Sequence, residues 1–431
     1  MIQIPLKEQL RIWLHVASNS FGGPAGQIAV IHKLVVEDKK LISEERFLHA
    51  LNFCMLLPGP EAQQLATYMG WMMNRWVGGL LAGGLFILPG FLSILFLSYL
   101  YVIFNNVPFV QGLFYGMKPA IIAIVVAALL RISKKSLKTK FYWFCAILAF
   151  VSLFFFNISF PIVVVSAGIF GIFYGKYFLK QEKVTEFEEI QKPNFLKSVQ
   201  TVVIWLLVWI FPILLTILSF GLNSNFHALN LFFSKMSLVT FGGAYAALSY
   251  VAQQAVEIYG WLQGTEMLDG LAMAETTPGP LIQTVQFVGF MGAYRFPENL
   301  SPYSAAFLGS VLSTWMTFAP CFLWIFTFAP YVEYIRSARL FSFALSAITA
   351  SVVGVIFNLS VWFVLKTIFL KNEQYVRYGF NFDYPVLKSI DLYALGIAMV
   401  AFILQFGLKR KLLEILGICT ILGVLVKWIP V

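Results

Sequence analysis

The sequence predicts an all-α polytopic membrane protein made of two homologous halves of inverted topology, each containing broken, re-entrant helices. Apolar residues make up 59% of the 431-residue chain and charged residues only 12%. The mean hydropathy is +0.80, which is typical of a chain whose solvent is the lipid bilayer. Uncharged runs are each long enough for one or two crossings of roughly 20 residues, and they cover 76–117, 141–175, 198–234, 299–332 and 340–365.

An internal repeat predicts the two halves. Phe21-Gly22-Gly23 returns as Phe241-Gly242-Gly243, and Pro58-Gly59-Pro60 returns as Pro278-Gly279-Pro280. Both motifs recur at the same offset in the sequence, and two unrelated motifs would rarely fall in one frame. We therefore expect a duplicated unit.

The first half is expected to begin with two broken elements. Segments 10–20 and 24–31 flank the first glycine pair, and segments 47–57 and 61–74 flank the first Pro-Gly-Pro. Each piece is too short to span a bilayer, and basic residues lie at both ends of each element, so we interpret both as re-entrant. Four crossings should follow, at 76–104, 110–130, 141–156 and 160–178.

One further apolar segment, 198–219, has no partner in the first half and should invert the second copy, which begins at about residue 227. The charges agree with this inversion. The tip after residue 156 has no Lys or Arg, whereas its counterpart is Lys409-Arg410-Lys411, and basic loops mark the cytoplasmic side. We expect a first repeat at 1–178, a linker with the extra helix at 179–225, a second repeat at 226–431 and a cytoplasmic N-terminus.

Composition and residue spacing disfavour other classes of function. The net charge of +10 follows the membrane topology, so we expect no nucleic-acid partner. We also expect no metal, disulfide or cofactor and no enzyme activity, because the acids, histidines and cysteines form no catalytic or ligand cluster. The scattered residues are Cys54, Cys145, Cys321, Cys419, His15, His32, His49 and His227.

Inverted repeats with interrupted helices are typical of secondary transporters. A helix that restarts after Pro-Gly-Pro presents unpaired backbone N–H groups and a partial positive charge, which suit an anion. Pro60 and Pro280 fit the first helical position, and Gly59 and Gly279 permit close approach of a ligand. Gln63 and Gln283 lie one turn further on and have amide groups that donate hydrogen bonds.

The chain resembles the chromate ion transporters in their long, two-domain form. The resemblance rests on FGGPAGQIAVIH from Phe21, SEERFLHALNFCMLLPGPEAQQLATYMGW from Ser43, FGGAYAALSYV from Phe241 and TTPGPLIQTVQFVGF from Thr276. It implies a carrier in the bacterial inner membrane that exports chromate, with sulfate as an analogue and with proton coupling and a homodimer left open. The family motifs correspond to Gly22, Gly23, Pro58, Gly59, Pro60, Gly242, Gly243, Pro278, Gly279 and Pro280.

Several of these residues also have structural interpretations. The glycine pairs could serve only close helix packing, the Pro-Gly-Pro breaks could be simple kinks, and the two glutamines could cap freed carbonyl groups. Arg75 and Arg295 each end a broken element, where a cation could complement a helix C-terminus or recruit anions to the two mouths of the path. The related motifs around Pro89 and Pro320, which follow a slightly larger offset than the other repeats, are expected to serve as hinges or packing kinks.

Two charged residues are candidates for the transport mechanism. Glu61 follows the first Pro-Gly-Pro and could carry a coupled proton, or it could only offset the helix dipole. Lys118 lies within an apolar segment and could bind the anion, pair with Glu61 or another acid, or snorkel to the interface. A carrier of sulfate or another oxyanion and an anion channel are the alternatives to chromate export.

Overall fold

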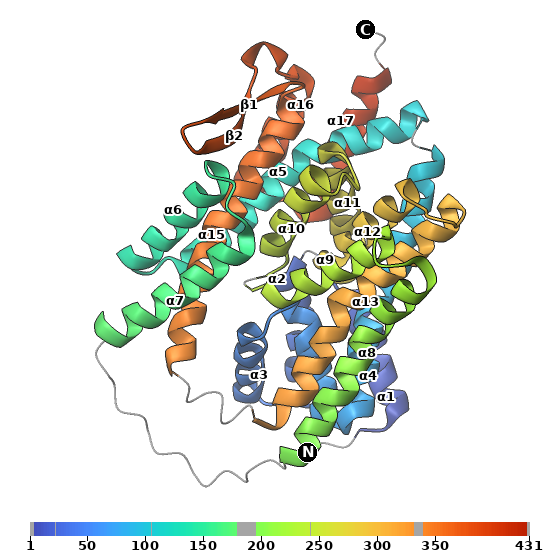
Figure 1. The fold of residues 1–431 in the computed structure, drawn as a ribbon, viewed down its shortest axis with the longest axis vertical. Coiled ribbons are helices and arrows are strands. Elements are labelled where there is room, and N and C mark those ends of the chain that lie inside the picture. Colours follow the sequence, from blue (N-terminus) through green and yellow to red (C-terminus); the bar gives the residue numbers. More distant parts are fainter. Residues whose placement is uncertain are drawn as a thin grey trace.

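The computed structural model describes residues 4–21, 23–104, 106–178, 195–241, 243–331 and 339–428, and it is almost entirely helical (Figure 1). Six of the described helices are long and apolar enough to cross a membrane. The first half contains α1 (Leu6–Ser18), α2 (Gly23–His32), the π-helix η1 (Lys33–Asp38), α3 (Glu44–Leu56), α4 (Glu61–Phe104), α5 (Pro108–Ser136), α6 (Lys140–Phe154) and α7 (Phe160–Phe178).

The unpaired helix α8 (Phe195–Phe220) then leads into the second half, which repeats the same order. The linker residues 179–194 lie outside the described residues. The second half contains α9 (Asn225–Val239), α10 (Ala244–Gln253), η2 (Gln254–Ile258), α11 (Gly264–Thr276), η3 (Leu281–Gln283), α12 (Thr284–Arg295), α13 (Pro302–Phe328), η4 (Ala329–Tyr331), α15 (Arg339–Ile368), β1 (Asn372–Arg377), β2 (Phe380–Pro385), η5 (Leu387–Ser389), α16 (Leu392–Phe402), η6 (Ile403–Gly407) and α17 (Leu412–Trp428).

The broken elements of the first half are re-entrant, because each begins and ends at the same end of the helical bundle. Asn74, at the end of the first segment of α4, donates from Nδ2 to the carbonyl of Ile4 (2.5 Å) and to Gln9 Oε1 (3.0 Å). Lys39 Nζ, between the two elements, lies 3.4 Å from Glu8 Oε1. The chain then leaves this end of the bundle at Asn74 and Arg75, whose non-helical backbone separates the short segment of α4 from the crossing segment.

The second half closes its re-entrant elements in the same way, with a denser set of polar contacts. Trp261 Nε1 donates to Asn225 Oδ1 (2.7 Å), and the backbone N–H of Asn225 donates to Glu298 (2.6 Å). Arg295 forms two 2.7 Å hydrogen bonds to the carboxylate of Glu266. The starts of α9 and α11 and the end of α12 therefore meet at one level, as the inverted repeat requires.

Small residues set the packing of the long crossing helices. A Cβ on Gly116 of α5 would collide with the Cys419 carbonyl of α17, so only glycine permits this approach. The equivalent contact between the halves brings Gly171 of α7 against Ala347 of α15. Close approach through small residues is the usual means by which helices associate where apolar burial gives no net drive.

The described ends of the helices agree with the inversion. Asn157 lines a cavity beside the β-hairpin, whereas Arg410, in the counterpart loop, lines a different cavity together with Lys135 at the end of α5. The two loops therefore lie at opposite ends of the bundle. This is the arrangement that the basic residues predict.

The sequence analysis did not predict the short antiparallel hairpin β1–β2, which is inserted between α15 and α16. The corresponding connection between α5 and α6 is only residues 137–139. The hairpin is anchored to both halves: the N–H of Asn381 donates to the carbonyl of Phe155 (2.7 Å), and Lys366 Nζ lies 2.9 Å from Asp383 Oδ2. It thus covers one end of the helical bundle.

Candidate functional site

The four helix breaks meet inside the molecule, and each half is hydrogen-bonded to the other there. The N–H of Gly59 donates to the carbonyl of Thr240 (2.8 Å), and the N–H of Gly279 donates to the carbonyl of Ser20 (2.9 Å). Ser20 and Thr240 each precede the first residue of a glycine-pair motif, so the two bonds obey the internal repeat. The breaks form one shared centre, which four independent kinks would not.

The central glycines of the two Pro-Gly-Pro motifs are required by their backbone. Both have φ of +118°, a region that side chains rarely adopt. A Cβ on Gly279 would lie 2.9 Å from the Cα of Gly90, and one on Gly59 would lie 2.8 Å from Cys321 Sγ. Gly90 and Cys321 follow the prolines of the crossing helices, so each break packs against the proline kink of the other half.

The prolines lie one residue earlier than the expected first helical position, because Pro280 is the N-cap of η3 and α4 begins at Glu61, directly after Pro60.

Buried glutamines donate hydrogen bonds to two carbonyl groups of the breaks. Gln64 Nε2 donates to the carbonyl of Pro58 (2.7 Å), and Gln27 Nε2 donates to that of Gly279 (2.6 Å). The repeat places Ala247 opposite Gln27, so the second contact exists in one half alone.

The second glycine of each glycine pair faces open space and does not serve close helix packing. Gly23 and Gly243 have φ of +73° and +103°, and a Cβ on either would meet nothing within 4 Å. Both residues line a cavity and immediately precede or begin short helices, α2 and α10. Gly22 and Gly242 lie outside the described residues.

This cavity has a volume of about 460 Å³ and is lined by residues of both halves. Its walls are α2, α3, the start of α4, α5, the start of α10, the end of α11, α15 and the α16–α17 connection. Lys135 and Ser136 at the end of α5 and Arg410 in a loop mark its mouth. The helix N-termini of α2 and α10 face the interior, where their partial positive charges attract an anion.

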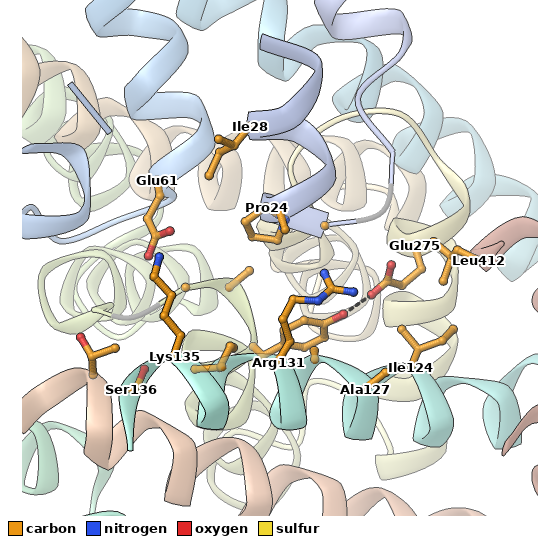
Figure 2. Close-up of a pocket in the computed structure, with 18 of the residues that line it drawn as sticks. Pro24, Ile28, Glu61, Ile124, Ala127, Arg131, Lys135, Ser136, Glu275 and Leu412 are labelled. Carbon is orange, nitrogen blue, oxygen red and sulfur yellow. Dashed lines mark hydrogen bonds between the residues drawn. The ribbon is translucent and has the colours of Figure 1, made fainter. Parts of the chain in front are cut away.

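Four charged side chains give the cavity its chemistry. Arg131 and Lys135 project from successive turns of α5, and Lys135 points toward Glu61 while Arg131 lies beside Glu275 (Figure 2). Glu275 is buried and accepts a 2.6 Å hydrogen bond from the hydroxyl of Tyr245. Two cations thus face two carboxylates across a space that admits a small ion.

The glutamines predicted to bind the anion lie behind this wall. Gln63 is fully buried and donates to Thr67 Oγ1 (3.0 Å). Gln283 donates to Gln286 Oε1 (2.6 Å) and to Thr314 Oγ1 (3.1 Å). Neither side chain is among the residues that line the cavity. Their contacts are with neighbouring polar side chains, and they hold the short helices after the breaks.

Lys118 also lies away from the cavity. Its Nζ is 3.2 Å from Asp269 Oδ2 on α11. Of the interpretations considered for Lys118, the structure therefore shows pairing with an acid other than Glu61. Glu61, by contrast, lines the cavity as expected from its position beside the break.

Arg75 stacks on the ring of Trp71 at 4.9 Å, whereas Arg295 bonds to Glu266.

Sequence reasoning did not single out four residues of the cavity: Arg131, Lys135, Tyr245 and Glu275. Arg131 and Lys135 belong to a basic stretch, with Lys134, Lys138 and Lys140, of the kind that marks a cytoplasmic loop. Two signals were available in the sequence. Arg131 and Lys135 are spaced i, i+4 at the end of an apolar helix, and Glu275 precedes the second Pro-Gly-Pro much as Glu61 follows the first. Among the described residues, no group of three His, Cys, Asp or Glu side chains could hold a metal.

Comparisons with known proteins agree with this architecture. The chromate transporter family model matches residues 8–172 and 227–425, one match in each half. A chromate transport protein of Pseudomonas aeruginosa is 32% identical over 344 residues, which cover 78% of this chain and 76% of that protein. A chromate transport protein of Cupriavidus metallidurans is 28% identical over 81% of this chain and 80% of its own length.

An uncharacterized transporter of Methanocaldococcus jannaschii is 25% identical over 96% of this chain and 92% of its own length. No solved structure matches. The two-part match covers both halves and leaves out the extra helix α8, as the internal repeat predicts. The chain is a multi-pass membrane protein that belongs to the chromate transporter family.

Proposed function

We propose that this protein is a secondary carrier that exports chromate, and that the cavity beside the helix breaks is its binding site. One observation carries the proposal: Arg131 and Lys135 point into a cavity that also receives the N-termini of α2 and α10. Guanidinium and ammonium groups bind oxyanions through charge-assisted hydrogen bonds, and helix N-termini add oriented N–H donors. The names of the bacterial relatives support chromate as the substrate.

The two carboxylates suggest how a proton enters the cycle. Glu61 and Glu275 face the same two cations, Arg131 and Lys135, that a dianion would bind. The substrate anion and the carboxylates therefore compete for these cations. Protonation of Glu61 removes a negative charge next to the substrate and frees Lys135. We propose that Glu61 carries a coupled proton, and that Glu275 is held by Tyr245 as a fixed wall of the site.

The mouth of the cavity is assigned to the cytoplasm. Lys135 at the end of α5 and Arg410 line the cavity, and their basic neighbours in the sequence are Lys134, Lys138, Lys409 and Lys411. Basic loops stay on the cytoplasmic side of bacterial inner membranes. The N-terminus is then cytoplasmic as well. Residues 1–178 and 226–431 act as the two transport repeats, and residues 179–225 connect and invert them.

A second cavity supports alternating access. It has a volume of about 350 Å³, lies beneath the β-hairpin and is lined by Asn358, Trp362 and Lys366 of α15. These positions correspond to Ala127, Arg131 and Lys135 of α5 in the frame that relates Pro89 to Pro320. The inner and outer cavities are therefore built from equivalent helix faces, and exchange between them would carry the ion across.

Sulfate shares the charge and tetrahedral shape of chromate, so the test must compare both ions. Purified protein is reconstituted into liposomes, and chromate and sulfate uptake is measured under an imposed pH gradient. The proposal predicts saturable chromate flux that responds to the gradient. Exclusive transport of sulfate would favour the alternative oxyanion carrier, and the absence of saturable flux of either ion would refute the proposal.

A further inference from the structure

A buried ion pair joins the two halves on the side opposite the cavity mouth. Lys118 Nζ of α5 lies 3.2 Å from Asp269 Oδ2 of α11. The hydroxyl of Tyr101, on α4, donates to the same oxygen at 3.0 Å. Asp269 is only 2% exposed, so its carboxylate is buried where α11 meets the first half. Charges in such a place are costly unless they are paired.

The internal repeat identifies the counterparts of this pair. Asp269 corresponds to His49 in the frame of the Pro-Gly-Pro motifs, and Lys118 corresponds to Thr349 in the frame of the two proline kinks. His49 Nε2 lies 3.6 Å from Glu45 in its own helix, and Thr349 Oγ1 donates to Leu345 in its own helix at 2.8 Å. The counterparts thus interact within their own helices, in contrast to the Lys118–Asp269 pair.

The cavity explains why the two counterparts are separated. Thr349 of α15 lines the cavity, and α3 borders it through Leu51 and Met55, whereas His49 of the same helix is not among the lining residues. On the outer side, α5 and α11 are in contact through Lys118 and Asp269. On the inner side, the cavity lies between their counterparts, α15 and α3. The two repeat-related helix pairs are therefore closed on one side and open on the other.

We propose that Lys118 and Asp269, with Tyr101, form the outer gate of the carrier, and that His49 and Thr349 mark the inner gate. The inference rests on the alternating access proposed above. In the outward-open state α11 separates from α5 and breaks the ion pair, while α3 closes on α15 and brings residues 49 and 349 together. The outer gate holds an ion pair between two helices, and the contacts of His49 and Thr349 stay within their own helices, so the ion pair biases the resting carrier toward the inward-open state.

Two matched cysteine pairs test the gates. In a chain whose native cysteines, Cys54, Cys145, Cys321 and Cys419, are replaced by alanine, one variant carries Lys118→Cys with Asp269→Cys, and the other carries His49→Cys with Thr349→Cys. Cross-linking by a short bis(methanethiosulfonate) reagent, which joins two thiols through reducible disulfide bonds, is measured without substrate. The outer pair should cross-link faster than the inner pair, because residues 118 and 269 are in contact in this conformation, and the difference is a lower limit because the outer variant itself lacks the ion pair. Its cross-link should abolish chromate flux, and a reductant should restore the flux, which shows that the variant is folded.

A third variant separates a gate from a merely stabilising contact. Asp269→Asn, added to the inner cysteine pair, should speed its cross-linking several-fold, because a weaker outer gate increases the outward-open population. An unchanged inner rate, or simultaneous formation of both cross-links in one chain that carries both cysteine pairs, would overturn the proposal. Cross-linking needs no substrate, so an absence of chromate flux would count against the proposed function and leave this result interpretable.

Discussion

The N–H of Gly279 donates a 2.9 Å hydrogen bond to the carbonyl of Ser20, which directly connects the second Pro-Gly-Pro to the first glycine pair. The equivalent bond runs from Gly59 to Thr240 at 2.8 Å. Each repeat therefore uses its own break to hold the other repeat. The two bonds lie where all four interrupted helices meet.

Alanine substitutions of the two central glycines should have different consequences. Gly279→Ala should prevent transport and lower the unfolding temperature in detergent, because its Cβ would lie 2.9 Å from the backbone Cα of Gly90. The positive φ adds a conformational cost of about 1 to 3 kcal/mol. Gly59→Ala should be milder when combined with Cys321→Ala, because the Cβ at Gly59 meets only side-chain atoms, Cys321 Sγ at 2.8 Å and the movable amide end of Gln64 at 2.9 Å.

Thermal unfolding followed by tryptophan fluorescence measures both effects, and Cys321→Ala alone is the control. No second substitution should rescue Gly279→Ala, because the opposing Gly90 atom belongs to the backbone. Equal stability of Gly279→Ala and the parent protein would show that the breaks do not pack as closely as described.

Arg131→Met and Lys135→Met should weaken chromate binding. Each removes a charge-assisted contact of about 1.5 to 3 kcal/mol, which corresponds to roughly 10- to 100-fold in affinity. Lys134→Met is the matched control, because Lys134 is exposed on the same helix but does not line the cavity. The half-saturation concentration of flux measures the effect, and equal values for all three variants would exclude the cavity as the binding site.

Glu61→Gln should separate transport from proton coupling. The amide keeps the size of the side chain but holds no titratable proton, so chromate exchange should persist while the pH gradient no longer drives uptake into inverted vesicles. Glu275→Gln is the comparison, because Glu275 is fixed by Tyr245 and should leave the response to the gradient intact. If Glu61→Gln vesicles respond to the gradient like the parent, another group carries the proton.

The two arginines that end the broken elements should differ in importance. Arg295 binds Glu266 through two 2.7 Å contacts and the carbonyl of Trp261 at 2.7 Å, so Arg295→Met should cost about 2 to 3 kcal/mol of stability. Arg75 stacks on Trp71, a contact of about 0.5 to 1 kcal/mol, so Arg75→Met should be milder. Unfolding temperatures in detergent test this order, and the reverse order would contradict it.

Much of the fold could be predicted because hydropathy and the recurrence of short motifs can be recognised in the sequence without knowledge of tertiary contacts. The crossings expected at 110–130, 141–156 and 160–178 correspond to α5, α6 and α7. The β-hairpin could not be derived from the repeat, because its segment exists in only one half.

The site was harder to predict than the fold, for two physical reasons. The crossing expected to end at residue 130 continues as α5 to Ser136, and this extension carries Arg131 and Lys135 into the cavity. The pairing of Lys118 with Asp269 depends on tertiary packing between the two halves, which no local pattern encodes. Glu61 and Gly23 could be identified because they adjoin motifs whose geometry is local.

Counterflow in proteoliposomes tests the central claim most directly. Vesicles loaded with unlabelled chromate are diluted into labelled chromate, and the label is followed with the parent protein and with the Arg131→Met, Lys135→Met double variant. A carrier that uses this cavity predicts transient, saturable accumulation of label above equilibrium with the parent, lost in the double variant. Label that only equilibrates, or identical accumulation in the double variant, would contradict the claim.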